Sequence, residues 1–485
     1  MNKKNKFRID EEFEKSSMSE SRKKVILTHV KEKLEKEKTL NLSIKEAMSS
    51  SVTGGTGDSY ITPYALALMN SRQNNFVIGL LGSLPNLLAT ISQIFGSPAM
   101  EKYPRKKIIV VSVALNALMW LPIISLSFFF WKNLFTNYLP TILIILYSLY
   151  AVFGAIAGPA WFSLMGELVP EKIRGKYFSK RNKIAGGVVL VSMLIAAFVL
   201  DFFKTKGLAL LGFSILFFIA CFFRLISVAL FTKHHYPKLK LEKGYYFSFV
   251  QFIKKAPYNN FGKFTIYVTL MHSAAAIAGP FFAVYMLKDL NFSYTIYMLT
   301  NVSATIFTLL FFPLVGKFSD KYGNRELLKF GSFLVPIIPI VWLFSPNPVY
   351  LILVPQLIAG IGWAAFNFAA SNFIYDSVTP QRRGICVAYF NVVAGIGIFL
   401  GATVGGLLAQ YLPITFMNKL LFIFLISGIL RFLVFIGIGK IKEVRTVEKP
   451  KKFIFYFKEI NPVNAINDLT RELKFKLLFK NTKYL

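Results

Sequence analysis

The chain has 485 residues, of which 54% are hydrophobic, 16% aromatic and only 16% charged. Soluble domains of this size carry about 25% charged residues and rarely gather their apolar residues into long uncharged runs. Here Ile142–Phe153 and Gly207–Phe223 contain no charged side chain. Runs of roughly 20 apolar residues cross about 30 Å of hydrocarbon as α-helices. The composition excludes an ordinary soluble protein and predicts an all-α membrane protein.

The formal net charge of +32 comes from 56 Lys and Arg residues against 24 Asp and Glu residues. Nucleic-acid-binding proteins carry such a charge on a folded polar surface, whereas here it lies between and beyond the apolar runs. This pattern predicts contact with membrane lipids, including anionic headgroups, and no nucleic-acid partner. The 2 cysteines and 4 histidines show neither a disulfide framework nor zinc spacing, so we expect no metal and no cofactor.

Twelve segments are predicted to cross the membrane as helices. They cover residues 49–71, 75–97, 107–131, 138–166, 179–202, 207–231, 262–288, 292–316, 328–345, 348–375, 385–410 and 417–439. The glycines of Gly54–Asp58 interrupt the first segment. Most loop lysines and arginines follow the even-numbered segments, which predicts that those loops and both termini are cytoplasmic.

The longest basic loop divides the segments into two sets of six. We therefore predict a charged tail (1–46), an N-terminal bundle (47–231), a central loop (232–261), a C-terminal bundle (262–440) and a basic tail (441–485). Within the central loop, Tyr245–Lys255 is aromatic and ends in charge, which favours a helix lying in the membrane interface. A disordered linker is the alternative.

The two halves carry the same landmarks in the same order. Arg174-Gly175 corresponds to Arg383-Gly384, and each arginine follows an acid, Glu167 or Asp376, by seven residues. Pro63 corresponds to Pro280, and Arg224 to Arg431. Shared hydrophobicity alone does not place such landmarks in register, so the sequence indicates an internal duplication. The paired arginines suggest a shared structural role, with binding of an anionic solute as the alternative.

After the eighth segment the chain reads Gly316-Lys317-Phe318-Ser319-Asp320-Lys321-Tyr322-Gly323-Asn324-Arg325. This resembles the G-x-L-x-D-R-x-G-R-R signature of the major facilitator superfamily. The equivalent stretch 97–106 keeps an acid and bases, but Ser97 and Pro104 replace its two glycines, and proline cannot adopt a left-handed turn. The resemblance covers about residues 48–440 and implies twelve helices in two pseudo-symmetric six-helix bundles.

The resemblance implies that these loop charges form a gate that ties the two bundles together on the cytoplasmic side. A close pair in such a loop is worth on the order of 1–4 kcal/mol, enough to bias one state against another. We expect Glu167 to pair with Arg174, and Asp376 with Arg383. Alternatively, the charges only cap helices and fix orientation. The predicted gate residues are Glu101, Lys102, Arg105, Glu167, Arg174, Gly316, Asp320, Lys321, Gly323, Arg325, Asp376 and Arg383.

In this superfamily the first, fourth, seventh and tenth helices line a central cavity. Asp58 lies near the middle of the first segment, where a carboxylate binds a proton or a cationic solute; alternatively it is interfacial and the helix begins near Tyr60. His272 is the only histidine within a segment and either titrates or packs. The predicted solute or proton residues are Asp58, Tyr60, Tyr64, Tyr150, Trp161, His272, Gln356, Trp363 and Asn367.

These features predict a secondary active transporter that moves a small solute across the plasma membrane by alternating access, with proton coupling through Asp58 as a further hypothesis. A membrane sensor or assembly partner that kept the same scaffold is the alternative.

We expect no enzyme, because no nucleophile–base set is visible in the sequence. An ATP-driven pump is disfavoured, because the sequence has no phosphate-binding loop. Glycines from Gly397 to Gly406 resemble an antiporter motif, but helix packing explains them better. The sequence does not fix the oligomeric state, and a monomer is compatible with it.

Overall fold

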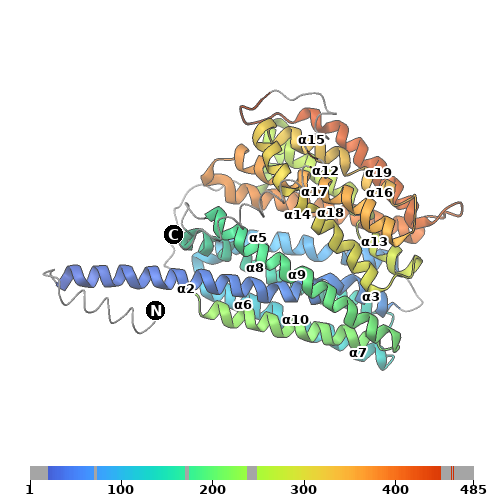
Figure 1. The fold of residues 1–485 in the computed structure, drawn as a ribbon, viewed down its shortest axis with the longest axis horizontal. Coiled ribbons are helices and arrows are strands. Elements are labelled where there is room, and N and C mark those ends of the chain that lie inside the picture. The colour runs from blue at the N-terminus through green and yellow to red at the C-terminus, as the bar shows by residue number, and fades with distance from the viewer. Residues whose placement is uncertain are drawn as a thin grey trace.

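The computed structural model describes residues 20–69, 74–169, 174–236 and 248–448, together with residues 460 and 463. These residues form helices joined by short connections, with no β-strand among them (Figure 1). The aromatic, lysine-containing stretch Lys451–Lys458 lies outside the described residues, as do residues 1–19 and the first part, 245–247, of the predicted interfacial helix.

The helices of the N-terminal half follow the apolar segments of the sequence. Their bounds are α2 Glu20–Thr56, η1 Asp58–Tyr60, α3 Ile61–Leu68, α4 Asn75–Leu81, α5 Leu84–Lys102, α6 Arg105–Leu118, α7 Trp120–Trp131, α8 Leu139–Leu168, α9 Arg174–Thr205 and α10 Ala209–Thr232.

A short helix in the central connection precedes the helices of the C-terminal half. The bounds are α11 Phe249–Lys255, η3 Ala256–Tyr258, α12 Asn260–Ala278, α13 Phe281–Val284, η4 Tyr285–Asp289, α14 Tyr294–Tyr322, α15 Asn324–Leu334, α16 Ile337–Val341, α17 Pro348–Ser377, α18 Pro380–Tyr411, α19 Lys419–Ile436 and η5 Gly437–Lys440. A capping box between Ser248 and Gln251 starts α11, which explains why this helix begins where it does.

Among the described residues, ten helical spans are long and apolar enough to cross a membrane. The other two predicted segments, 49–71 and 328–345, are interrupted. The first is divided at Gly57 between α2 and η1, and α2 itself begins at Glu20, well before the predicted start. The second breaks between Leu334 and Ile337, because Pro336 and Pro339 interrupt regular helical hydrogen bonding.

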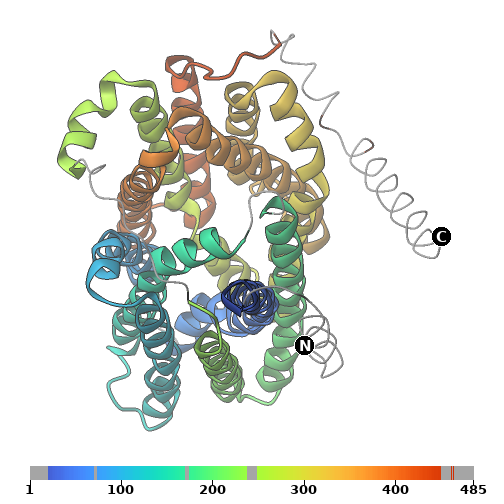
Figure 2. The same ribbon diagram turned by 90° about the vertical axis from the view of Figure 1, so that its left-hand side faces the viewer.

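The two halves place their helices in equivalent positions. α2 packs against α9 and α10, as α12 packs against α18 and α19; α5 packs on α8, as α14 packs on α17. Figure 2 looks along the bundle and shows the helices of the two halves gathered on opposite sides. The glycines of α18 serve this packing, because a Cβ at Gly401 or Gly405 would overlap the backbone carbonyls of α12.

The paired arginines make equivalent connections. Arg224 of α10 donates through Nε to Asn116 of α6 at 2.7 Å, and its guanidinium lies 4.0 Å from Glu46 of α2. Arg431 of α19 donates to the carbonyls of Val335, at the end of α15, and Ala275 of α12, at 3.0 and 3.2 Å. Each arginine therefore joins the last helix of its half to the first and third.

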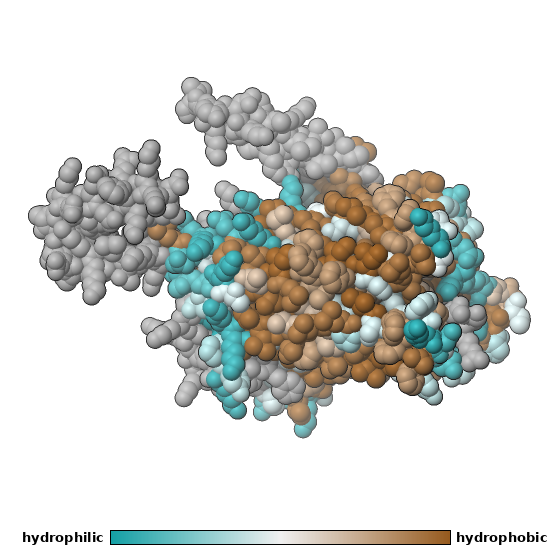
Figure 3. All heavy atoms as spheres, turned by 90° about the horizontal axis from the view of Figure 1, so that it is seen from below, coloured by the Kyte–Doolittle hydropathy of each residue, from teal (hydrophilic) through white to brown (hydrophobic). Residues whose placement is uncertain are grey.

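The molecule has two polar ends and an apolar belt between them (Figure 3). We name as the motif end the one where α5 connects to α6, α8 to α9, α14 to α15 and α17 to α18. The opposite, far end holds the connections that precede α4, α8, α10, α14, α17 and α19. In Figure 1 the motif end lies at the left, where α2 extends beyond the other helices. The belt is what lipid tails require of a membrane-spanning surface.

Candidate functional site

Asp58 lies at the break in the first membrane segment. It begins the single turn η1 between α2 and α3, and Gly57 before it packs against Trp120, leaving no room for a Cβ. The Tyr147 hydroxyl of α8 donates to Asp58 Oδ1 at 3.3 Å, and the Asp58 side chain keeps solvent-accessible surface. A broken helix of this kind frees backbone and side-chain groups for binding.

Aromatic rings of α8 line the surroundings of this carboxylate. Tyr147 and Tyr150 stack with ring centroids 5.3 Å apart and an interplanar angle of 13°, and Tyr150 packs on Trp120 at 4.9 Å. Tyr150, one of the predicted solute or proton residues, therefore belongs to the same cluster as Asp58. Trp161 lies elsewhere on α8, where the guanidinium of Arg181 covers its ring at 4.7 Å.

Tyr60 and Tyr64 are fully buried inside the N-terminal half. The Tyr60 hydroxyl donates to the Met193 carbonyl at 2.5 Å, and the Tyr64 hydroxyl lies 2.8 Å from Ser127 Oγ. Both phenols are thus hydrogen-bonded within the packed core, which favours a structural role for these two tyrosines.

In the C-terminal half, α12 and α17 bring together three of the predicted solute or proton residues. The His272 ring stacks on Trp363 with centroids 5.5 Å apart and an interplanar angle of 12°. Trp363 and Asn367 line one cavity of about 270 Å³ between α14 and α17, as their spacing of four residues predicts. Gln356 is half-buried two to three turns earlier on α17, and His272 itself is half-buried.

A buried ionic cluster in the N-terminal half involves Glu46, the last residue of the predicted N-terminal tail 1–46. Glu46 of α2 is 3% exposed, and its carboxylate accepts from Arg181 of α9 at 3.1 Å and faces Arg224. Burial raises the pKa of Glu46, and the two arginines oppose that shift. The only sequence signal was position: Glu46 is the last charge before the apolar run.

The gate residues of the N-terminal half form one strong pair. Arg105, at the start of α6, is buried and donates to Glu167 at 2.8 Å and to Ser163 at 3.2 Å. We expected Arg174 as the partner of Glu167, but the side chains of Arg174 and Glu101 lie outside the described residues. Lys102 is exposed. Among the described contacts, Arg105 is the arginine that holds Glu167.

In the C-terminal half the expected pair between Asp376 and Arg383 does not form. Asp376 accepts from Arg445 Nε at 2.7 Å and from Asn324 at 2.6 Å. The Arg383 guanidinium instead covers the Tyr375 ring at 4.8 Å and donates to the Tyr375 carbonyl at 3.2 Å. The physical reason is that Arg445 and Asn324 already occupy the Asp376 carboxylate, so Arg383 bonds the neighbouring carbonyl of Tyr375 instead.

The residues after the last helix, 441–445, form a segment that we name the strap. Its Glu443 accepts from the backbone N–H of Arg325 at 2.7 Å and so caps the start of α15. The Arg325 guanidinium donates to the Ile441 carbonyl at 2.7 Å and also bonds Glu326. Arg445 additionally lies 3.9 Å from the exposed Asp320.

The glycines of the motif have different roles. Gly323 has φ +87° at the turn between α14 and α15, and a Cβ there would overlap the Glu443 carboxylate. Gly316 has only ordinary contact space beside Phe368. Lys321 lies over the Tyr322 ring at 5.1 Å. The strap therefore covers the motif turn, and only a glycine permits both the turn and the cover.

At the far end, backbone and side chains tie the two halves together. Asp201, near the end of α9, accepts from the backbone N–H groups of Tyr294 and Thr295, the first residues of α14, at 2.7 and 2.8 Å. Gln410 of α18 accepts from the Asn75 backbone at 3.1 Å. Asp201 is not among the residues predicted from the sequence, because its only signal is an acid among apolar residues at a helix end.

Taken together, the apolar belt, the duplicated helix arrangement and the interrupted first segment define a multi-pass membrane protein of the kind built from two related halves. The chain belongs to the Major Facilitator Superfamily, whose sequence model matches residues 47–267 and again 264–482.

Curated relatives agree with this assignment. The vacuolar basic amino acid transporter 1 of Saccharomyces cerevisiae is 32% identical over 116 residues, which are 24% of this chain and only 19% of that protein. An uncharacterized MFS-type transporter of Methanocaldococcus jannaschii is 25% identical over 392 residues, covering 78% of this chain and 94% of the relative. The crystal structure of nucleoside transporter NupG has the same fold, with a TM-score of 0.62 at 15% identity over 83% of this chain and 100% of that one.

Proposed function

We propose that this protein is a secondary transporter that moves a small solute by alternating access between its two halves. The family and the relatives named as transporters support this proposal. The distribution of contacts supports it as well, because Asp201 and Asn75 join the two halves at the far end. At the motif end, Arg105–Glu167 lies within the N-terminal half, and Arg445–Asp376 joins the strap to the C-terminal half. This is the arrangement expected of a state closed at the far end.

We further propose twelve crossings, with α2 and α3 forming the first and α15 and α16 the ninth. The excess of lysine and arginine at the motif end supports a cytoplasmic location for this end and for both termini. We also propose that the chain is divided into two bundles, 47–231 and 262–440, with the tails 1–46 and 441–485 and the loop 232–261. We propose the plasma membrane as the location of the protein.

The solute or proton site that we propose centres on Asp58. The observation that carries it is an acid in a helix break, hydrogen-bonded to Tyr147 and yet accessible to solvent inside the bundle. A carboxylate beside aromatic faces favours a positively charged solute, because both attract cations. His272, Trp363 and Asn367 are the contribution we propose from the C-terminal half.

Flux into liposomes that contain the purified protein tests this proposal. The probes are arginine, lysine and a lipophilic cation such as tetraphenylphosphonium, each with and without an imposed pH gradient. We expect uptake of at least one probe, stimulated by the gradient and abolished in Asp58→Asn. Asp289→Asn is the matched control, because Asp289 bonds Asn418 within one half at the far end.

Two outcomes contradict parts of the proposal. Uptake that ignores the gradient and survives Asp58→Asn removes proton coupling and the Asp58 site. No uptake of any probe, by protein shown to be folded, favours a sensor or an assembly partner on the same scaffold.

A further inference from the structure

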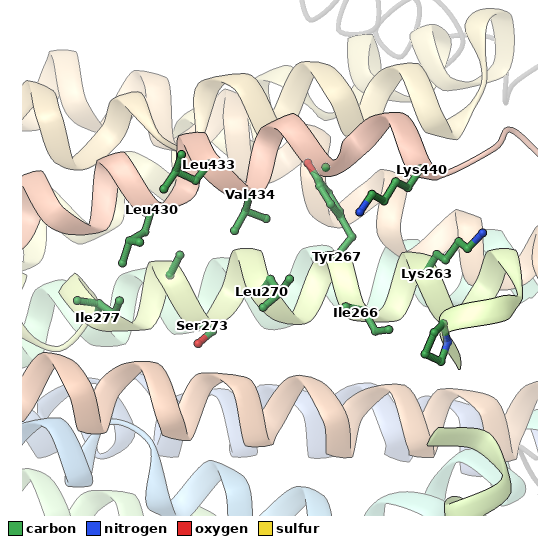
Figure 4. Close-up of a pocket in the computed structure, with 13 residues that line it drawn as sticks. Lys263, Ile266, Tyr267, Leu270, Ser273, Ile277, Leu430, Leu433, Val434 and Lys440 are labelled. Carbon is green, nitrogen blue, oxygen red and sulfur yellow. The ribbon is translucent and has the colours of Figure 1, made fainter. Parts of the chain in front are cut away.

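A groove of about 710 Å³ runs between α12 and α19 on the outside of the C-terminal half (Figure 4). Its walls are mostly aliphatic, with Ile266, Leu270 and Ile277 from α12 and Leu430 and Leu433 from α19. Leu270 and Leu433 are 51% and 59% exposed, so the groove opens to the belt that faces lipid. Its volume lies in the range of pockets that bind small organic molecules.

The groove has one charged end. Lys263 and Lys440 lie at the same end of it, the motif end, and Figure 4 shows both lysines beside the aliphatic walls. No acid is among the lining residues that the structure describes, and neither lysine belongs to an ion pair of the described chain. Two exposed ammonium groups above an apolar groove complement a ligand with an anionic head and an apolar tail.

The length of the groove matches one lipid leaflet. From Lys263 to Ile277 the α12 backbone rises about 21 Å at 1.5 Å per residue. One leaflet contributes about 15 Å of hydrocarbon. With the lysines at headgroup level, the aliphatic walls therefore extend through the full depth of the nearer leaflet.

The equivalent position in the N-terminal half is closed by the protein itself. There Ser49 and Thr53 of α2 donate to carbonyls of α10 at 2.5 and 3.0 Å, and Glu46 faces Arg224. The alignment that matches Pro63 with Pro280 places Lys263 where Glu46 stands. Between α12 and α19 themselves, the polar contacts of the described residues lie in the middle of the helices, at Ser427 and Arg431. At the motif end, Asn260 of α12 bonds the backbone of Lys442 beyond the groove. The two halves therefore differ at this position: Glu46 is a buried acid, and Lys263 is an exposed base.

We propose that this groove binds an anionic glycerophospholipid from the leaflet at the motif end. Its phosphate lies between Lys263 and Lys440, and an acyl chain lies along Ile266, Leu270 and Leu433. This site is separate from the Asp58 region and does not depend on the transported solute.

Native mass spectrometry of the purified full chain, titrated with phosphatidylglycerol or phosphatidylcholine, tests the proposal. We expect the wild type to retain phosphatidylglycerol preferentially. Replacing both lysines, Lys263→Gln with Lys440→Gln, should weaken that binding by about tenfold or more, since a basic residue near an anionic surface contributes on the order of fivefold. Leu270→Trp keeps both charges and fills the groove, and should also lower retention.

The matched control is Lys106→Gln with Lys233→Gln, which removes two exposed charges at the motif end of the other half. It should leave retention unchanged. Equal binding of both lipids by the wild type overturns the proposal, as does wild-type retention in the Lys263/Lys440 double variant. If Leu270→Trp retains the lipid as the wild type does, the groove does not hold the acyl chain. Thermal unfolding of each variant identifies any loss that comes from misfolding.

Discussion

Asp201 offers the sharpest test of how the two halves are held together. It belongs to α9 of the N-terminal half, but its carboxylate accepts two backbone N–H groups at the start of α14 in the other half, at 2.7 and 2.8 Å. Replacing it by alanine, Asp201→Ala, removes a charged cap that exists only while the far end is closed. We expect this variant to open the far end more often than the wild type does.

The magnitude follows from the geometry. Loss of a helix cap costs about 0.5–2 kcal/mol, and the favourable interaction of an anion with a helix N-terminus contributes about 0.3–1 kcal/mol. Ser293 still caps α14 within its own half, and Asp201 is partly exposed, so a net cost of about 1–2 kcal/mol is reasonable. At tenfold per 1.4 kcal/mol, the ratio of closed to open molecules should fall by roughly 5- to 30-fold.

Spin labels at Lys206 and Phe416, one on the exposed far-end surface of each half, measure this ratio by electron–electron double resonance. Cys221 and Cys386 are first replaced by alanine. The wild type should give mainly a short distance, and Asp201→Ala an additional longer one. Asp289→Ala is the control, because its partner Asn418 lies in the same half. Identical distance distributions in Asp201→Ala and the wild type would refute the reasoning.

Three further predictions concern the motif end. Gly323→Ala should destabilise the folded protein by about 1–2 kcal/mol, because φ is +87° and the new Cβ overlaps Glu443. Gly316→Ala, the control, should be nearly neutral. Equal melting temperatures for the two variants would contradict this prediction. Arg445→Gln should lower the free energy of unfolding by about 1 kcal/mol, and by much less when Asp376→Asn is already present. A double-mutant cycle in chemical unfolding measures this coupling, and strictly additive effects would rule out the ion pair. Desolvation holds the pKa of His234 below its usual 6.5, so the neutral ring stabilises the folded state fully above about pH 6.5, and this stability is lost as the pH falls toward the lower folded-state pKa. His234→Phe should flatten this part of the curve of stability against pH. An unchanged curve would contradict the prediction.

The architecture was accessible from the sequence because apolar runs report directly on burial in lipid. Ten spans agree with the predicted segments, and the two exceptions have local causes. Gly57 ends α2 before Asp58, while the prolines Pro336 and Pro339 divide the predicted ninth segment. Hydropathy averages over such breaks, because a window of about 19 residues does not register where individual hydrogen bonds stop.

The polar contacts were harder to predict because they depend on which helices meet. Spacing along the chain suggested that Arg383 would pair with Asp376, but Arg445, some 70 residues later, occupies that place. Likewise, the Asp201 carboxylate accepts a backbone hydrogen bond from the start of α14, in the other half. By contrast, the shared helix face of Trp363 and Asn367 was predictable, because neighbours four apart on one helix need no tertiary information, and both side chains line one cavity. Their contact with a solute stays a prediction.

The strap has a practical consequence for protein engineering. A fluorescent protein or affinity tag joined directly after Lys440 would remove Glu443 and Arg445, and with them the cap of α15 and the partner of Asp376. A tag joined after Glu448 would leave both in place. Fusions that differ by only eight residues should therefore differ in yield and in melting temperature, although both junctions leave the membrane-spanning helix α19 intact.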